Sequence, residues 1–145
     1  MHIHTRKFAL IGGWIMLAMG VLSFIPALSQ ANALLPALKV DTSYGLFLSY
    51  FPMNIFNKVA LVLFGAAGVL VSSLPNVIAA VKFSRVVCIV MGVLAVVGLI
   101  PSMNTFFGYW PLFRGEVLAH GVFAILGGYY GYVIPARIYK REAQL

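Results

Sequence analysis

An acid and a histidine stand near the start of the last apolar segment of this 145-residue chain. Glu116 and His120 are spaced so that they share one face of a helix. Asn54, Asn57 and Lys58 stand where an earlier apolar segment begins. Because ionisable side chains inside a membrane are costly, they are functional candidates by default. We expect these five residues to form one polar cluster, and a carboxyl beside an imidazole could share a proton there or bind a polar ligand.

A purely structural role for the same cluster stays open. Glu116 would stabilise the positive end of its helix dipole, and it could also pair with Lys58. The lysine could instead extend its ammonium group to the membrane surface. A neighbouring side chain or carbonyl could satisfy His120.

The composition indicates which elements position these residues. The chain is 62% hydrophobic and 9% charged, whereas soluble domains carry about 25% charged residues. Four apolar segments, at about 8–28, 55–74, 83–102 and 117–134, each approach the ~20 residues that a membrane-spanning helix needs. We therefore predict an all-α fold, a single domain over 1–145 that forms an integral membrane bundle of four transmembrane helices. Its outer loops are rich in aromatic residues, which predicts a membrane-interface cap or a binding surface.

The net charge of +7 follows the loops and does not indicate nucleic-acid binding. One side of the membrane receives most of the basic residues, namely Arg6, Lys7, Lys82, Arg85, Arg137, Lys140 and Arg141. This pattern predicts a multi-pass protein of the bacterial cytoplasmic (inner) membrane with both termini in the cytoplasm. The first apolar run is longer than a signal peptide allows, so we expect a retained helix despite the small residues Ala31 and Ala33.

The two halves of the chain resemble each other, which favours a duplicated helical hairpin in a parallel repeat. The matching features are Met19–Leu22 with Met91–Leu94, Pro26 with Pro101, and the aromatic residues before Pro52 and Pro111. Small residues that allow close helix packing occur at Gly65, Gly68, Gly121, Gly127, Gly128 and Gly131. They could pack within the bundle, against another membrane-protein subunit, or in self-association.

Other chemistry has little support in the sequence. Cys88 is the single cysteine, so no internal disulfide or paired-thiol centre can form. His120 is the one histidine in a span, and no metal or haem site and no cofactor are expected. Three acidic residues and the absence of catalytic motifs argue against an enzyme. We expect a non-enzymatic membrane protein, an accessory or scaffold subunit, with a small-molecule or lipid binder or transporter as the alternative.

Four stretches carry a family resemblance: "LAMGVLSFIPAL", "FPMNIFNKVALVLFGAAGVL", "MGVLAVVGLIPSMN" and "HGVFAILGG". Together they resemble a family of small four-helix bacterial membrane proteins known as a domain of unknown function. The resemblance implies polar positions at Asn54 and His120. Histidines that the family pattern would place at Asn57 and Leu61 are replaced here. The family implies the architecture and no established activity.

Overall fold

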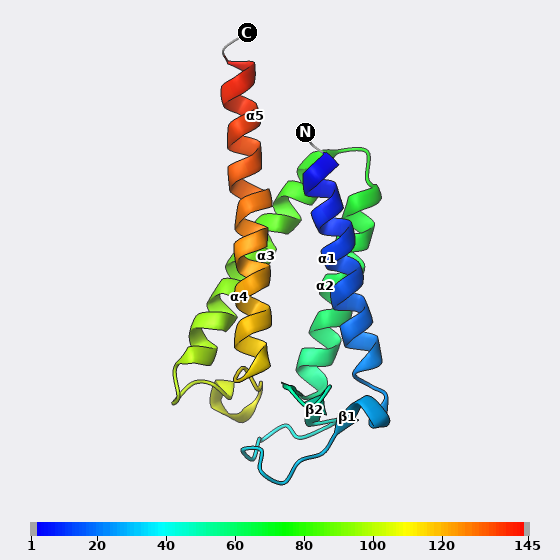
Figure 1. Cartoon of the computed structure of the whole chain (residues 1–145), viewed down its shortest axis with the longest axis vertical. Helices are drawn as coiled ribbons and strands as arrows, with labels where there is room; N and C mark the ends of the chain where they lie inside the picture. Colours follow the sequence, from blue (N-terminus) through cyan, green and yellow to red (C-terminus); the bar gives the residue numbers. More distant parts are fainter. Residues whose placement is uncertain (1–2, 144–145) are drawn as a thin grey trace.

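The computed structural model describes residues 3–143 as a helical bundle with a small sheet at one end (Figure 1). The helices are α1 (Ile3–Leu22), α2 (Ile55–Ser73), α3 (Val77–Leu99), α4 (Gly115–Gly128) and α5 (Ile134–Glu142). The 3-10 turns η1 (Pro26–Leu28) and η2 (Phe106–Gly108) lie in the two loops at the end of the bundle opposite the termini, which are called the outer loops. The π-helical turn η3 (Tyr129–Val133) joins α4 to α5. Four helical segments are long and apolar enough to cross a membrane. The predicted all-α four-helix membrane fold is confirmed.

The helix ends differ from the predicted ones for local reasons. Helix α1 covers Ile3–Leu22, whereas the predicted span was 8–28. It ends before residue 28 because Pro26 lacks an N–H group and begins the turn η1. Helix α3 begins at Val77, well before residue 83, because the side chain of Asn76 accepts a hydrogen bond from the Ile78 N–H at 2.8 Å.

The last span also continues beyond the predicted end at residue 134. Pro135 deprives the Gly131 carbonyl of its usual helical donor. The Arg85 Nε atom donates to that carbonyl at 2.8 Å, and Thr5 Oγ1 donates to the neighbouring Tyr130 carbonyl at 3.3 Å. Side chains from α3 and α1 thus satisfy carbonyl groups of the π-helical turn, and the helix continues as α5, which projects beyond the bundle (Figure 1).

The first outer loop holds a small antiparallel sheet that composition did not reveal. Its strands are β1 (Ser29–Gln30), β2 (Gly45–Phe47) and β3 (Phe51–Met53), in the order β1-β2-β3. Phe47 of β2 and Met53 of β3 are fully buried. Gly45 is required there, because an added Cβ would lie 2.7 Å from the Gln30 carbonyl oxygen. The sheet therefore forms a compact cover over the outer end of α2.

Two helix pairs make up the bundle: α1 packs mainly on α2, and α3 mainly on α4 (Figure 1). Close backbone approach joins each pair. A Cβ added at Gly68 would lie 2.7 Å from the Ala9 carbonyl oxygen, and one added at Gly127 would lie 2.7 Å from the Ser84 carbonyl oxygen. Gly65 also faces α1, and Gly128 and Gly131 face α3. Gly121 meets nothing within 4 Å, so it takes no part in packing within the described chain.

Many buried positions of one helix pair recur in the other. One constant spacing along the chain relates the buried face of α1 to that of α3: Thr5, Phe8, Ala9, Gly12 and Met16 recur as Ala80, Phe83, Ser84, Val87 and Met91. The repeat thus pairs Met91 with Met16, and the predicted match to Met19 was wrong by about one helical turn. A second constant spacing relates α2 to α4 and pairs Asn57 with Glu116 and Gly68 with Gly127. The bundle is a parallel repeat of two hairpins.

Candidate functional site

Asn54 holds the outer end of α2 in place. Its side-chain oxygen accepts hydrogen bonds from the N–H groups of Phe56 at 3.0 Å and Asn57 at 3.5 Å. The Asn57 side chain accepts from the Asn54 N–H at 3.1 Å, which completes a reciprocal cap. The Asn54 amide also donates to the carbonyls of Val40 at 2.9 Å and Tyr109 at 2.8 Å. This one buried residue therefore joins both outer loops to the start of α2.

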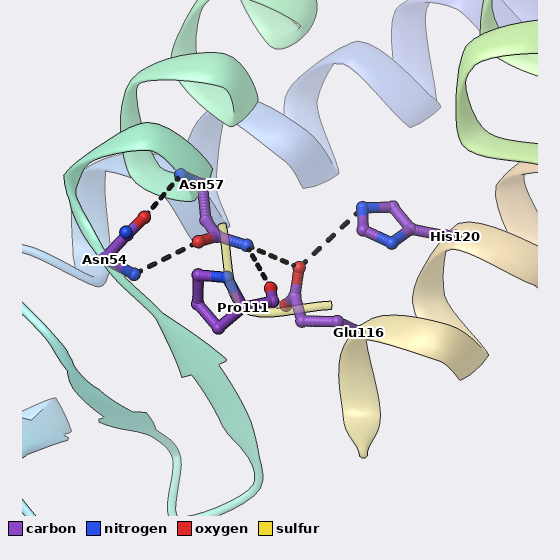
Figure 2. Close-up of polar contacts among 5 residues, drawn as sticks. All are labelled: Asn54, Asn57, Pro111, Glu116 and His120. Atoms are coloured by element: carbon purple, nitrogen blue, oxygen red, sulfur yellow. Dashed lines mark hydrogen bonds and ion pairs between the residues drawn. The ribbon is translucent and has the colours of Figure 1, made fainter. Parts of the chain in front are cut away.

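Asn57 extends the connection to the second hairpin. Its Nδ2 atom donates to Glu116 Oε2 and to the Pro111 carbonyl, both at 3.0 Å (Figure 2). Both side chains are buried. Since Asn57 and Glu116 are equivalent positions of the repeat and contact each other, the pseudo-two-fold axis passes between them.

His120 lies one helical turn beyond Glu116, at the inner edge of this network (Figure 2). Its Nε2 atom is 3.7 Å from Glu116 Oε2, an ion-pair distance when the imidazole is protonated. Its Nδ1 atom is buried and has no hydrogen-bond partner among the described residues. The residue is 8% exposed. An unpaired buried imidazole nitrogen is costly, so His120 needs an explanation beyond packing.

A small cavity adjoins this histidine. Its volume is about 30 Å³, and its polar lining comes from Asn57, Trp110, Glu116 and His120. Trp110 contributes a second buried N–H group without a partner among the described residues. The rest of the lining is apolar and comes mainly from α2 and α3. A cavity of this size accommodates roughly one or two water molecules, and its polar groups are sufficient to bind them.

Lys58 lies on another side of α2 and makes no ion pair with Glu116. Its Nζ atom donates to Ser43 Oγ at 2.8 Å and to Ser29 Oγ at 3.3 Å, and lies 5.5 Å from the centre of the Phe24 ring. The reason is helical geometry, because neighbouring residues point about 100° apart. Asn57 faces Glu116, so Lys58 cannot do so. Four of the five predicted residues thus form one network, and Lys58 instead joins α2 to the first outer loop.

Sequence reasoning missed two contributors to the site, the indole of Trp110 and the Pro111 carbonyl. The aromatic-proline motif that occurs in both halves contains these residues, so a signal was present. In the first outer loop, burial raises the pKa of the Tyr44 hydroxyl above its ordinary value, and the positive charge of Arg114 partly opposes this effect. Among the side chains that the structure describes, no three of the types that bind metals lie together.

Four long apolar helices joined by close glycine contacts, with a buried polar network at one end, define a multi-pass membrane protein with a four-helix bundle. The chain belongs to the family described as a domain of unknown function (DUF4383), whose model matches residues 6–133. The predicted resemblance to such a family is confirmed. Comparisons with curated proteins and with solved structures gave no match.

Proposed function

We propose that the outer end of the bundle is a proton-binding site, in which Glu116 and His120 bind and release a proton together with water in the adjoining cavity. The observation that supports this proposal is the pairing of a buried carboxylate with a buried histidine whose second nitrogen has no partner, beside a polar cavity. Networks of Glu and His inside membranes commonly serve as proton sites.

The cavity size selects the kind of ligand. Metabolite-sized ligands occupy pockets of roughly 300–1,000 Å³, whereas this cavity measures about 30 Å³. The cluster therefore favours a proton or a water-sized species, and not a larger transported molecule. Among the described lining residues, Glu116 and His120 are the titratable ones, so the change in charge is confined to this pair. The proposal includes no catalytic step.

Infrared difference spectroscopy of the purified protein in mild detergent tests the proposal. On acidification between roughly pH 9 and pH 4, the wild type should gain the C=O band of a buried carboxylic acid. Glu116→Gln should lose this band, because glutamine retains an acceptor for Asn57 but cannot be protonated. Asp41→Asn is the matched control, since Asp41 is an exposed acid in the same outer region. A Glu116→Gln spectrum identical to the wild type would contradict the proposal.

One observation favours a second function, that of an accessory subunit. Phe106 and Phe107 are adjacent in the second outer loop, and both adopt left-handed backbone conformations with φ of 44° and 58°. Such conformations are strained for bulky residues, and these two are 41% and 61% exposed. A second membrane protein that buries both rings would explain why the strain is retained.

Native mass spectrometry of the protein extracted from its own membrane tests this second function. A subunit should leave the membrane with other chains attached, and Phe106→Ser with Phe107→Ser should release them. The control is Leu48→Ser, which changes an exposed residue with positive φ in the other outer loop. Recovery of the chain free of other proteins would exclude the accessory role.

The orientation in the membrane belongs to the same proposal. The concentration of basic residues at the end that carries both termini favours a cytoplasmic location for that end in a bacterial inner membrane. A reporter enzyme that is active only in the periplasm should be inactive when fused after the last residue and active when inserted beside Asp41. The opposite result would contradict the proposed orientation and would leave the proposed proton site unchanged.

A further inference from the structure

Two apolar crevices separate the hairpins, one on each side of the bundle. The first lies between α1 and α4, the second between α2 and α3, and each has a volume of about 480 Å³. The first is lined on α1 by Phe8, Ile11 and Ile15 and on α4 by Val122, Phe123, Leu126 and Tyr130. The second is lined by Leu63, Phe64, Ala67, Val71, Ala79, Phe83 and Val86.

The crevices are equivalent under the internal repeat. The constant spacing that relates α1 to α3 carries Phe8 to Phe83 and Ile11 to Val86, and the spacing that relates α2 to α4 carries Leu63 to Val122. The same correspondence carries the basic residue of one crevice, Lys7, to that of the other, Lys82. Neither lysine belongs to the packed core, because both are exposed. Their recurrence at the same place therefore points to a role in the crevices.

The dimensions correspond to one leaflet of a bilayer. Each crevice occupies the half of the bundle nearest the chain termini. On the four helices the lining residues extend over roughly 10 to 17 Å at 1.5 Å per residue. Half of the ~30 Å hydrocarbon core of a bilayer has the same depth. Each lysine lies toward the terminal end of its crevice, at the level where lipid headgroups begin.

Charge selects the headgroup. The end of the bundle that carries the termini holds seven of the ten lysine and arginine residues and one acidic residue, Glu142, whereas the other two acidic residues, Asp41 and Glu116, lie at the opposite end. Among the side chains that the structure describes, which exclude that of Glu142, the one ion pair is the contact between Glu116 and His120. Lys7 and Lys82 therefore pair with none of the described acids. A basic pocket between membrane helices is suited to an anionic phospholipid headgroup.

We propose that the two crevices are a pair of pseudo-symmetric binding sites for anionic phospholipids of the leaflet nearest the termini. An acyl chain lies along the apolar walls of each crevice, and its headgroup phosphate contacts Lys7 in one site and Lys82 in the other. The sites are independent of the Glu116 network at the outer end.

Native mass spectrometry with added phosphatidylglycerol, and with phosphatidylcholine of the same acyl chains, tests the charge requirement. We expect two phosphatidylglycerol molecules to be retained in preference to phosphatidylcholine. Lys7→Gln and Lys82→Gln should each weaken one site roughly fivefold, and the double variant should weaken both. Lys140→Gln is the matched control, because this exposed lysine lies at the same end of the molecule and lines neither crevice. Equal retention of both lipids would overturn the proposal.

A second set of variants tests the crevices themselves. Val122→Trp and Leu63→Trp should each obstruct one crevice and remove one retained lipid, while Leu70→Trp should not, because Leu70 lines neither crevice. All three side chains are exposed, so the fold should tolerate them, and helical circular dichroism should stay unchanged. Full lipid retention in Val122→Trp and Leu63→Trp would place the lipids elsewhere. Dimerisation through these faces without lipid would show that a second copy occupies them.

Discussion

In the first hairpin, the second helix (α2) starts with a reciprocal asparagine cap. In the second hairpin, the second helix (α4) starts after Arg114, which has φ of 53° and no side-chain cap. Five buried positions of α1 nevertheless correspond to buried positions of α3, and two of α2 correspond to buried positions of α4. Some equivalent positions of the repeat carry different residues. The position of Asn57 in the first hairpin is Glu116 in the second, and the position of Leu61 is His120. Packing is thus duplicated, while the ionisable pair of the polar network is confined to one copy.

The largest effect should come from the shared packing. Gly68→Leu and Gly127→Leu each force a side chain against helix backbone at equivalent contacts, Ala9 and Ser84. We expect each to lower the free energy of unfolding by about 3 kcal/mol, measured by thermal unfolding in mild detergent. Gly121→Leu is the control, because a Cβ there meets nothing within 4 Å. Tolerance of one substitution but not the other would break the equivalence of the hairpins.

Asn54→Ala should be the next most harmful change. It tests a feature of the first hairpin alone, since α4 in the second hairpin has no side-chain cap. It removes the cap of α2, worth about 1 kcal/mol, and leaves the carbonyls of Val40 and Tyr109 without their amide donor. A total loss of about 2 kcal/mol is expected. Asn76→Ala, which removes only the cap of α3, should cost less. Equal losses for the two variants would show that the links to the loops contribute nothing.

A double-mutant cycle measures the contact at the pseudo-symmetry axis. Asn57→Leu leaves Glu116 without its amide donor and should cost about 1–2 kcal/mol. Combining it with Glu116→Leu should recover part of that loss, with a coupling energy of about 1 kcal/mol. The measurement is again thermal unfolding of the four proteins in the cycle. Strictly additive losses would mean that the hydrogen bond between them has no energetic weight.

The smallest effect on stability is expected for His120→Leu, which gives the second hairpin the residue of the first, Leu61. The change removes the cost of the unpaired Nδ1 atom, and it also removes the contact between Nε2 and Glu116. Because these two effects oppose each other, the free energy of unfolding should change by less than about 0.5 kcal/mol. The same variant should alter the pH-dependent infrared signal of Glu116. A large loss of stability would instead assign His120 a structural role.

The sequence was sufficient for features that depend on composition and spacing along one helix. Four apolar segments predicted the spans, and the polar residues at the starts of two of them predicted that Asn57 and Glu116 lie together. The direction of Lys58 was mistaken because adjacent helical residues cannot face the same partner. The continuation of the last helix through Pro135 could not be predicted. The side chains that donate hydrogen bonds to the carbonyl groups there, Thr5 and Arg85, come from other helices.

The contact between Asn57 and Glu116 also bears on how such a bundle can arise. In a dimer of two identical hairpins, any residue on the symmetry axis meets its own copy. Two glutamates there would repel each other when ionised, and two asparagines would carry no charge. A single chain that contains both hairpins escapes this restriction, because each copy can mutate separately. A symmetric homodimer could never place an amide beside a carboxylate at its axis. Fusion of the two halves into one chain makes this arrangement possible.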